Sequence, residues 1–191
     1  MGSTTADTMS DADLIRRALQ VDLQVFADVI RRHERPVFSY LARRAGASAA
    51  EDLLSEVWAV ALENLSSYDT AWSSARPWLF AIARNRLRSH WRSNPKGDPA
   101  IEQYHDPWPD VDDRLVARAN AERLRQAVDG LRDAERETLL LVVWEQLTPA
   151  EVAVVMGVPA ATVRSRLHRA RADLRARLDP HGGPHITAGE Q

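Results

Sequence analysis

The chain of 191 residues contains no cysteine. This excludes a disulfide framework, a thiolate zinc site and a cysteine nucleophile, and it suits a reducing compartment such as the cytoplasm. The sequence also lacks an apolar run of about 20 residues, the length that a helix needs to cross a bilayer. Its first ten residues are small and polar and show no basic or apolar segment of a secretory signal. We therefore expect a cytoplasmic protein without membrane insertion.

Residues for catalysis are also scarce. The six histidines are scattered, and none lies at metal-ligand spacing with carboxylates on an expected helix. His181 and His185 share a tail with glycine and proline, where we expect no metal site. Asp52 and Glu56 lie four residues apart, but such a pair without a neighbouring base or metal is more typical of a solvated helix face. The sequence predicts neither an enzyme nor a cofactor.

Basic residues are not in excess, because the formal net charge is −2, an unusual value for a protein that binds DNA on its own. The distribution of charge is more informative than its sum. One block within residues 84–92 carries arginines and no acid, and a second block follows Pro159. Acidic residues gather between the two, over 98–113. We interpret this stretch, which is also rich in proline, as a linker between two basic modules.

Helical periodicity dominates the chain, without a convincing strand or internal repeat. A short helix is expected over 11–19, and Asp22 can cap a longer one with a kink at Pro36. A capping box at 48–51 starts the next helix, and Pro77 opens a fourth. Four helices of this kind can close a small core.

The sequence therefore predicts an all-α fold of two small helical domains joined by an acidic, Pro-rich linker. The expected segments are an N-terminal extension with a short helix (1–21), a helical bundle (22–93), the linker (94–114), a second helical domain (115–178) and a disordered tail (179–191). Helices of the second domain are expected over 115–128, 134–145, 149–156 and 160–178.

The last two of these helices form the most informative stretch of the chain. Thr148 and Glu151 form a capping box with Pro149 at the first helical position. Gly157 suits the left-handed residue that ends the helix, and Pro159 restarts a helix after a very short turn. This arrangement is typical of a helix-turn-helix motif that binds DNA.

The final helix has the properties of a recognition helix. Between Pro159 and Leu178, six arginines oppose one acid, Asp173, beside a single apolar stripe. Arginine reaches guanine edges or phosphates, and small neighbours allow close approach to the major groove. A solvated basic face is the plainer alternative, but we favour DNA binding. The candidate contacts are Thr162, Arg164, Ser165, Arg166, His168 and Arg169.

A second basic surface combines aromatic and amide side chains in the loop after residue 66 and in the helix that follows. Aromatic rings offer a stacking surface to unpaired bases, and arginines follow the phosphates of a single strand. The sequence does not decide whether Tyr68 and Trp72 are exposed or buried, whereas it predicts that Trp78 lies in the core. Candidate contacts to a single strand are Tyr68, Trp72, Arg76, Arg84, Asn85, Arg88 and Arg92.

Taken in order, these features resemble the extracytoplasmic-function (ECF) group of bacterial sigma factors, within the sigma-70 family. Residues 51–58, EDLLSEVW, are similar to the family's polymerase-binding helix, and residues 78–85, WLFAIARN, to its promoter-melting helix. Residues 157–171, GVPAATVRSRLHRAR, closely match its reader of the upstream promoter element. The resemblance spans about residues 22–178, and the order and spacing of the three motifs make it specific.

The resemblance implies an initiation factor that binds core RNA polymerase and directs it to promoter DNA. The first domain would bind the clamp helices of the β′ subunit through Asp52, Leu53, Ser55 and Glu56. It would also capture the non-template strand of the minus-ten element, with one base flipped into the loop at 68–74. The second domain would read the minus-thirty-five element and contact the β flap. The linker would lie in the RNA exit channel, and a separate anti-sigma factor is the expected regulator.

Some positions depart from the family pattern, in which Ser55 is commonly glutamine and Ser89 is commonly aspartate. Ala75 and Arg76 stand where the family commonly has a Phe-Arg pair, so the promoter sequence does not follow from the resemblance. The alternative from the residues alone is a conventional helix-turn-helix regulator. It would bind duplex DNA without polymerase and would need two-fold symmetry, for which the chain shows no dimerisation heptads.

Overall fold

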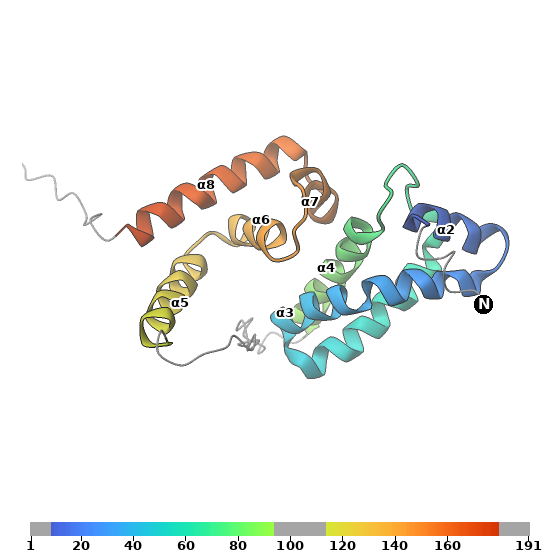
Figure 1. Cartoon of the computed structure of the whole chain (residues 1–191), viewed down its shortest axis with the longest axis horizontal. Coiled ribbons are helices and arrows are strands. Elements are labelled where there is room, and N and C mark those ends of the chain that lie inside the picture. Colours follow the sequence, from blue (N-terminus) through green and yellow to red (C-terminus); the bar gives the residue numbers. More distant parts are fainter. Residues whose placement is uncertain (1–8, 94–113, 180–191) are drawn as a thin grey trace, which may run out of the picture. The chain divides into compact units, whose positions relative to one another are not determined.

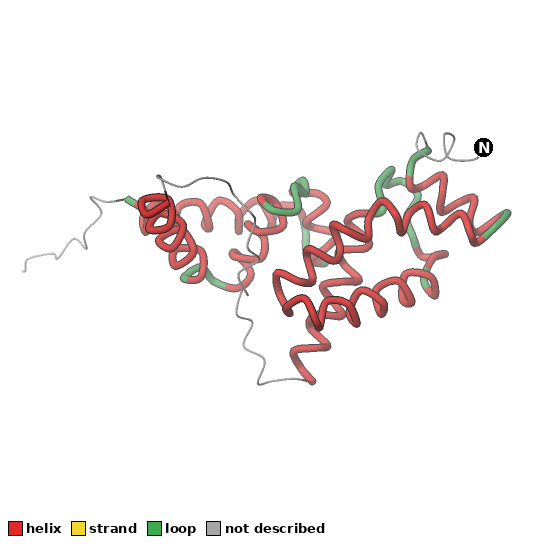
Figure 2. Tube along the Cα trace, turned by 60° about the horizontal axis from the view of Figure 1, so that its bottom comes forward, coloured by secondary structure: helices red, strands yellow, loops and turns green. Residues whose placement is uncertain are grey.

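The computed structural model describes residues 9–93 and 114–179. Seven α-helices and two short 3-10 helices cover most of these residues, and no strand occurs among them (Figures 1 and 2), which confirms the predicted all-α fold. Within the same ranges no helix is long and apolar enough to span a bilayer. The chain divides into two compact units, and we call residues 9–93 the N-terminal domain and 114–179 the C-terminal domain. Most of the predicted linker and tail lies outside the described residues.

The N-terminal domain contains, in chain order, α2 (Asp11–Gln20), η1 (Leu23–Val25), α3 (Phe26–Glu63), η2 (Leu65–Ser67) and α4 (Arg76–Ser93). The Ser10 hydroxyl caps α2 by accepting a hydrogen bond from the Asp13 amide at 3.2 Å. Asp22, predicted to cap the long helix, instead caps η1, because its carboxylate accepts from the Gln24 amide at 2.9 Å. The 3-10 turn therefore separates Asp22 from the start of α3.

The long helix α3 doubles back at Gly46. This residue has φ 79° and ψ 160°, a combination that is essentially restricted to glycine. The segments before and after it run alongside each other in opposite directions (Figure 1). Pro36, where we predicted a kink, keeps helical backbone angles inside the first segment. The second segment carries the candidate polymerase-binding residues.

Aromatic and aliphatic side chains from α2, α3 and α4 form the core of the N-terminal domain. The rings of Tyr40 and Phe80 meet edge to face with their centroids 5.1 Å apart, and both side chains are fully buried. Burial of each ring stabilises the fold by roughly 2–3 kcal/mol. Other buried positions on these helices include Leu14, Ile15, Phe26, Val29, Val37, Leu41, Val57, Leu79 and Leu87. This packing fixes which side of α4 faces outward.

The C-terminal domain contains α5 (Arg114–Asp129), α6 (Asp133–Val143), α7 (Pro149–Met156) and α8 (Ala160–Leu178). Every end lies within about two residues of its predicted position, the usual uncertainty of a helix boundary. Leu131, Leu139, Leu167 and Ala170 form a buried cluster against which Val142 and Leu174 pack.

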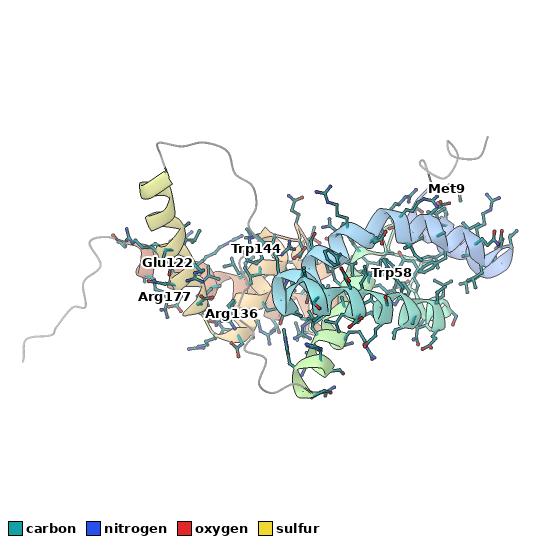
Figure 3. All side chains as sticks on the ribbon, turned by 90° about the horizontal axis from the view of Figure 1, so that it is seen from below. Met9, Trp58, Glu122, Arg136, Trp144 and Arg177 are labelled. Carbon is teal, nitrogen blue, oxygen red and sulfur yellow. The ribbon has the colours of Figure 1, made fainter. Side chains whose placement is uncertain are left out.

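The end of α8 is joined to the turn after α5. Arg177, labelled in Figure 3, donates from Nη2 to the carbonyl oxygen of Gly130 at 2.9 Å. A Cβ added to Gly130 would lie 2.3 Å from Nη1 of Arg177. A side chain at position 130 would therefore displace the guanidinium group.

Candidate nucleic-acid interface

The helix-turn-helix has the local contacts that the sequence predicts. The Thr148 amide donates to Oε2 of Glu151 at 2.7 Å, and the Glu151 amide donates to Oγ1 of Thr148 at 3.3 Å, so the capping box is confirmed. Gly157 follows α7 with φ 64°, the left-handed conformation that glycine adopts without strain. Because a Cβ there would meet nothing within 4 Å, the backbone angle rather than lack of space explains the glycine.

Helix α8 buries one side and exposes a basic one. Val163, Leu167 and Ala170 are buried in the domain core. The candidate DNA contacts lie on the remaining surface, with Arg164, Ser165, His168 and Arg169 exposed and Thr162 and Arg166 half-buried. The predicted residues therefore share the outward part of the helix, although Thr162 and Arg166 are less accessible than the rest.

A hollow of about 430 Å³ runs along α8. Arg164, Arg171 and Arg175 supply its cationic lining, His168 lies between them, and the remaining lining is Val142, Pro149 and Leu167. The four cationic or titratable residues recur about once per helical turn, so they form one row about 16 Å long. Arg171 and Arg175 are absent from the contacts predicted from the sequence. Their place in the row follows from the helical period of α8, whereas the hollow itself depends on Val142 of α6 and Pro149 of α7, which complete its lining.

Arg169 differs from the other arginines of the helix because it has a buried partner. Its Nε lies 3.0 Å from Oε1 of Glu135, whose side chain is only 6% exposed. Arg132 approaches the same oxygen at 3.8 Å. One edge of the Arg169 guanidinium group is therefore used within the domain. Nothing in the local sequence singles out Glu135, since an acid in the first turn of a helix is common.

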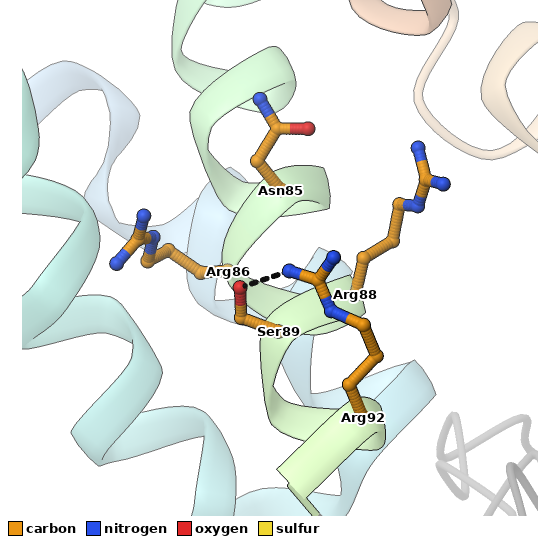
Figure 4. A pocket seen from close by; sticks show the side chains of 5 residues that line it. All are labelled: Asn85, Arg86, Arg88, Ser89 and Arg92. Carbon is orange, nitrogen blue, oxygen red and sulfur yellow. Dashed lines mark hydrogen bonds between the residues drawn. The ribbon is translucent and has the colours of Figure 1, made fainter.

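On α4, five polar side chains, three of them exposed, surround a second hollow of about 270 Å³ (Figure 4). Asn85, Arg88 and Arg92 are exposed, and Nη2 of Arg92 donates to Oγ of Ser89 at 2.9 Å. Arg86 points away from Arg88 in Figure 4 and lies 4.0 Å from a Glu56 carboxylate oxygen. Two other candidates, Arg76 and Arg84, are half-buried.

The loop before α4 places its two aromatic residues differently. Tyr68 is 7% exposed, its ring packs edge to face on Trp78 at 5.5 Å, and its hydroxyl donates to the Trp72 carbonyl oxygen. Trp72 is half-buried. Burial raises the pKa of Tyr68 to about 12, with the charges of Asp11 and Asp69 adding to the effect. Of the two possibilities that the sequence left open, Tyr68 therefore takes the buried one, with its ring packed against Trp78.

Asp11 also holds the loop, and the sequence did not mark it. Its amide donates to the Ser73 carbonyl oxygen at 3.1 Å, and Oδ2 accepts from the Ala75 amide at 2.8 Å. His33 lies 2.6 Å from the same oxygen, and Arg32 donates to Oδ1 at 2.9 Å. Burial alone would raise the pKa of Asp11, but the hydrogen bonds from His33 and Ala75, the His33 charge and the Arg32 hydrogen bond together lower it to about 2.

The candidate polymerase-binding residues lie on the second segment of α3. Asp52, Ser55 and Glu56 are exposed, and the Ser55 hydroxyl donates to the Glu51 carbonyl oxygen at 3.2 Å. Leu53 is only 3% exposed, so it packs in the core and cannot form the predicted surface contact. The apolar period of the helix explains this result, since Leu53 and Val57 share its buried side.

Comparisons with known proteins agree with this architecture. The family model described as Sigma-70 region 2 matches residues 29–96, and the model described as Sigma-70, region 4 matches residues 121–174. The RNA polymerase sigma factor NccH of Alcaligenes xylosoxydans xylosoxydans is 30% identical over 182 residues, which cover 90% of this chain and 96% of NccH. The ECF RNA polymerase sigma factor SigC of Mycobacterium tuberculosis is 29% identical over 182 residues, 94% of this chain and 97% of SigC.

Solved structures share the fold. CnrH, in complex with the cytosolic domain of CnrY, aligns with a TM-score of 0.62 at 24% identity over 88% of this chain and 97% of CnrH. The sigma factor RpoE from Bartonella quintana, in complex with the anti-sigma factor NepR, aligns with a TM-score of 0.56 at 21% identity over 82% of this chain and 98% of RpoE. The two region matches and the 30% identity along nearly all of NccH show that this chain belongs to the ECF group of sigma-70 family RNA polymerase sigma factors.

Proposed function

We propose that this sigma factor divides promoter recognition between two surfaces, α8 and the α4 surface with its preceding loop. Each surface is the exposed, arginine-bearing side of a helix whose other side is buried. The row of Arg164, His168, Arg171 and Arg175 carries the proposal. It lies on the second helix of a helix-turn-helix, the helix that enters the major groove in this motif.

Position along α8 suggests separate roles in reading the minus-thirty-five element. Arg164, Ser165 and His168 lie in the first turns, the part of a recognition helix that contacts base edges. Arg171 and Arg175 lie farther along and hold phosphates. Thr162 and Arg166, both half-buried, flank the base-reading residues. Arg169 orients the helix through Glu135 and adds charge from its exposed edge.

The α4 surface holds the single non-template strand of the minus-ten element. Asn85 has an amide that can read a base edge, while Arg88 and Arg92 follow the phosphates. Arg76 and Arg84 support this surface from less exposed positions. Trp72 offers the accessible part of its ring to an unpaired base, and Tyr68 acts by holding the loop.

The polymerase contact rests on charge. Asp52 and Glu56, one turn apart, face basic groups of the β′ clamp helices, with Ser55 beside them. The C-terminal domain contacts the β flap, and the acidic linker lies in the RNA exit channel.

RpoE was solved with an anti-sigma factor, and we assign a separate anti-sigma factor to the same face of α3. The protein performs no catalytic step of its own and works in the cytoplasm, where polymerase meets promoter DNA.

Reversing the charge of the α3 face tests this assignment. Asp52→Arg with Glu56→Arg should abolish co-elution with core polymerase, because the variant presents cations to a basic partner. The matched control, Glu34→Arg with Glu63→Arg, reverses two exposed acids elsewhere on α3 and should co-elute as wild type does. Circular dichroism should show equal helix content in both. Normal co-elution of the Asp52/Glu56 variant would remove this site, and specific binding of the free protein to duplex DNA would favour the conventional regulator.

A further inference from the structure

Asp11 brings together three segments that are distant in sequence. It lies in the first turn of α2, its side chain accepts hydrogen bonds from His33 and Arg32 on α3, and its backbone and carboxylate contact Ser73 and Ala75 in the loop before α4. Its side chain is 6% exposed. A buried carboxylate with this many donors is satisfied and fixed in place.

The loop is consequently held near both ends. The Tyr68 hydroxyl donates to the Trp72 carbonyl oxygen, and Asp11 holds Ser73 and Ala75. The Ala75 carbonyl oxygen accepts from the Leu79 amide at 2.9 Å, so Ala75 belongs to the loop and to the start of α4 at once. Asp11 therefore sets how the loop carrying Trp72 joins the helix carrying Asn85 and Arg88.

We infer that Asp11 is a positioning residue for promoter opening, which holds the loop at 68–75 in the conformation that receives an unpaired base. This inference rests on the proposed function of the α4 surface. A loop ordered before binding loses little conformational freedom when it captures the strand, so more of the contact energy is available to keep the duplex open. Asp11 acts through the loop and does not contact DNA.

The test compares Asp11→Asn with Asp13→Asn, which changes a half-exposed acid two residues farther along α2 that pairs with Arg16. Asparagine keeps one acceptor oxygen but removes the charge and adds an N–H that faces donors. In holoenzyme assembled with core polymerase, Asp11→Asn should slow opening of a linear duplex promoter about tenfold, the effect of losing roughly one hydrogen bond. Core binding and transcription from a template already melted at the minus-ten element should stay near wild type. Asp13→Asn should match wild type throughout.

Hydrogen exchange on the full chain measures the restraint directly. Amides at 71–75 should exchange faster in Asp11→Asn than in wild type, while those of α8 should not change. If duplex opening, core binding and transcription from the melted template fall together, Asp11 is merely structural and the inference is wrong. Wild-type opening by Asp11→Asn would also overturn it.

Two further variants keep the outcome decisive. If Asp11→Asn does not fold, Arg32→Met carries the test, because it removes one donor to Asp11 while keeping the apolar stem, and it should show a smaller but selective opening defect. Wild-type opening by a folded Arg32→Met would then reject the inference. Asn85→Ala with Arg88→Ala separates the two proposals: if it impairs opening while Asp11→Asn does not, the α4 assignment stands and the positioning role fails.

Discussion

The two proposed DNA-binding surfaces are built in different ways. The α8 surface follows from one continuous helix, which begins at Ala160 just after the Gly157 turn. The helix before that turn, α7, begins with the Thr148 capping box. The α4 surface depends on the loop before it, which is fixed by a bond between Ala75 and Asp11 across 64 positions of sequence. The first surface is a product of local sequence, and the second is a product of the tertiary fold. Distant substitutions should therefore disturb α4 far more than α8.

The largest effect should come from removing the polar contacts of α4. Asn85→Ala with Arg88→Ala should slow opening of a duplex promoter by about 10- to 100-fold, since each of the two lost contacts is worth roughly 0.7–1.4 kcal/mol. A template already melted at the minus-ten element should recover much of the lost transcription. Permanganate reactivity of the promoter measures the opening.

A matched control for this variant is Arg31→Ala, which removes an exposed arginine paired with Asp28 on α3. It should open the promoter normally. An equal defect in both variants would mean that total charge, rather than the α4 surface, determines opening.

Within α8, two arginines of one row should separate base reading from phosphate binding. Arg164→Ala should reduce the free energy of binding to the upstream element by about 1–3 kcal/mol and relax selectivity at one base pair. Arg175→Ala should weaken binding to all DNA sequences alike and reduce the salt dependence of that binding. Holoenzyme binding to a panel of upstream elements at several salt concentrations checks both. Identical selectivity profiles for the two variants would show that the row does not divide its roles.

The same contrast explains what the sequence could and could not predict. Capping boxes, glycine turns and apolar stripes act within a few residues, so the helices of the C-terminal domain and the outward side of α8 followed from the sequence. Asp11 occupies an ordinary first-turn position, and only the fold brings it to Ala75. Tyr68 likewise lies in a polar stretch, and its burial depends on Trp78 packing over it. Leu53 lies in the stretch that resembles the family's polymerase-binding helix, but the apolar period of α3 places it on the buried side with Val57.

Acid should weaken the N-terminal domain through Asp11. The pKa of this carboxyl is about 2 in the folded chain against an ordinary 3.8. The ionised carboxylate therefore adds about 2 kcal/mol to the free energy of unfolding. This contribution is complete above pH 3.8 and is lost as the pH falls through about 2. The other titratable groups that face the carboxylate are His33 and Arg32, which bond to it from α3, and Tyr68, whose pKa responds to the charge of Asp11. Denaturant unfolding should show the stability difference between wild type and Asp11→Asn shrinking as the pH falls, and a constant difference would contradict this origin.

The smallest effect at neutral pH should come from Tyr68→Phe. Loss of the hydroxyl bond to Trp72 should cost about 1 kcal/mol. The pKa of Tyr68 is about 12 against an ordinary 10.0, so its neutral form stabilises the fold below pH 10.0 and this contribution is lost as the pH rises through about 12. Tyr68→Phe should therefore resist alkali better than wild type. Circular dichroism and tyrosinate absorbance would show this, and parallel alkaline unfolding of the two proteins would exclude Tyr68 as its cause.

The ion pair between Arg169 and buried Glu135 has a consequence for the ions around the promoter. An arginine that displaces a condensed counterion from DNA must bring an uncompensated charge to a phosphate. Glu135 offsets part of the charge of Arg169 at 3.0 Å, and Asp173 lies 3.7 Å from Arg177. The number of counterions released when α8 binds should therefore be smaller than the arginine count of the helix suggests, and replacing Glu135 by glutamine should increase it.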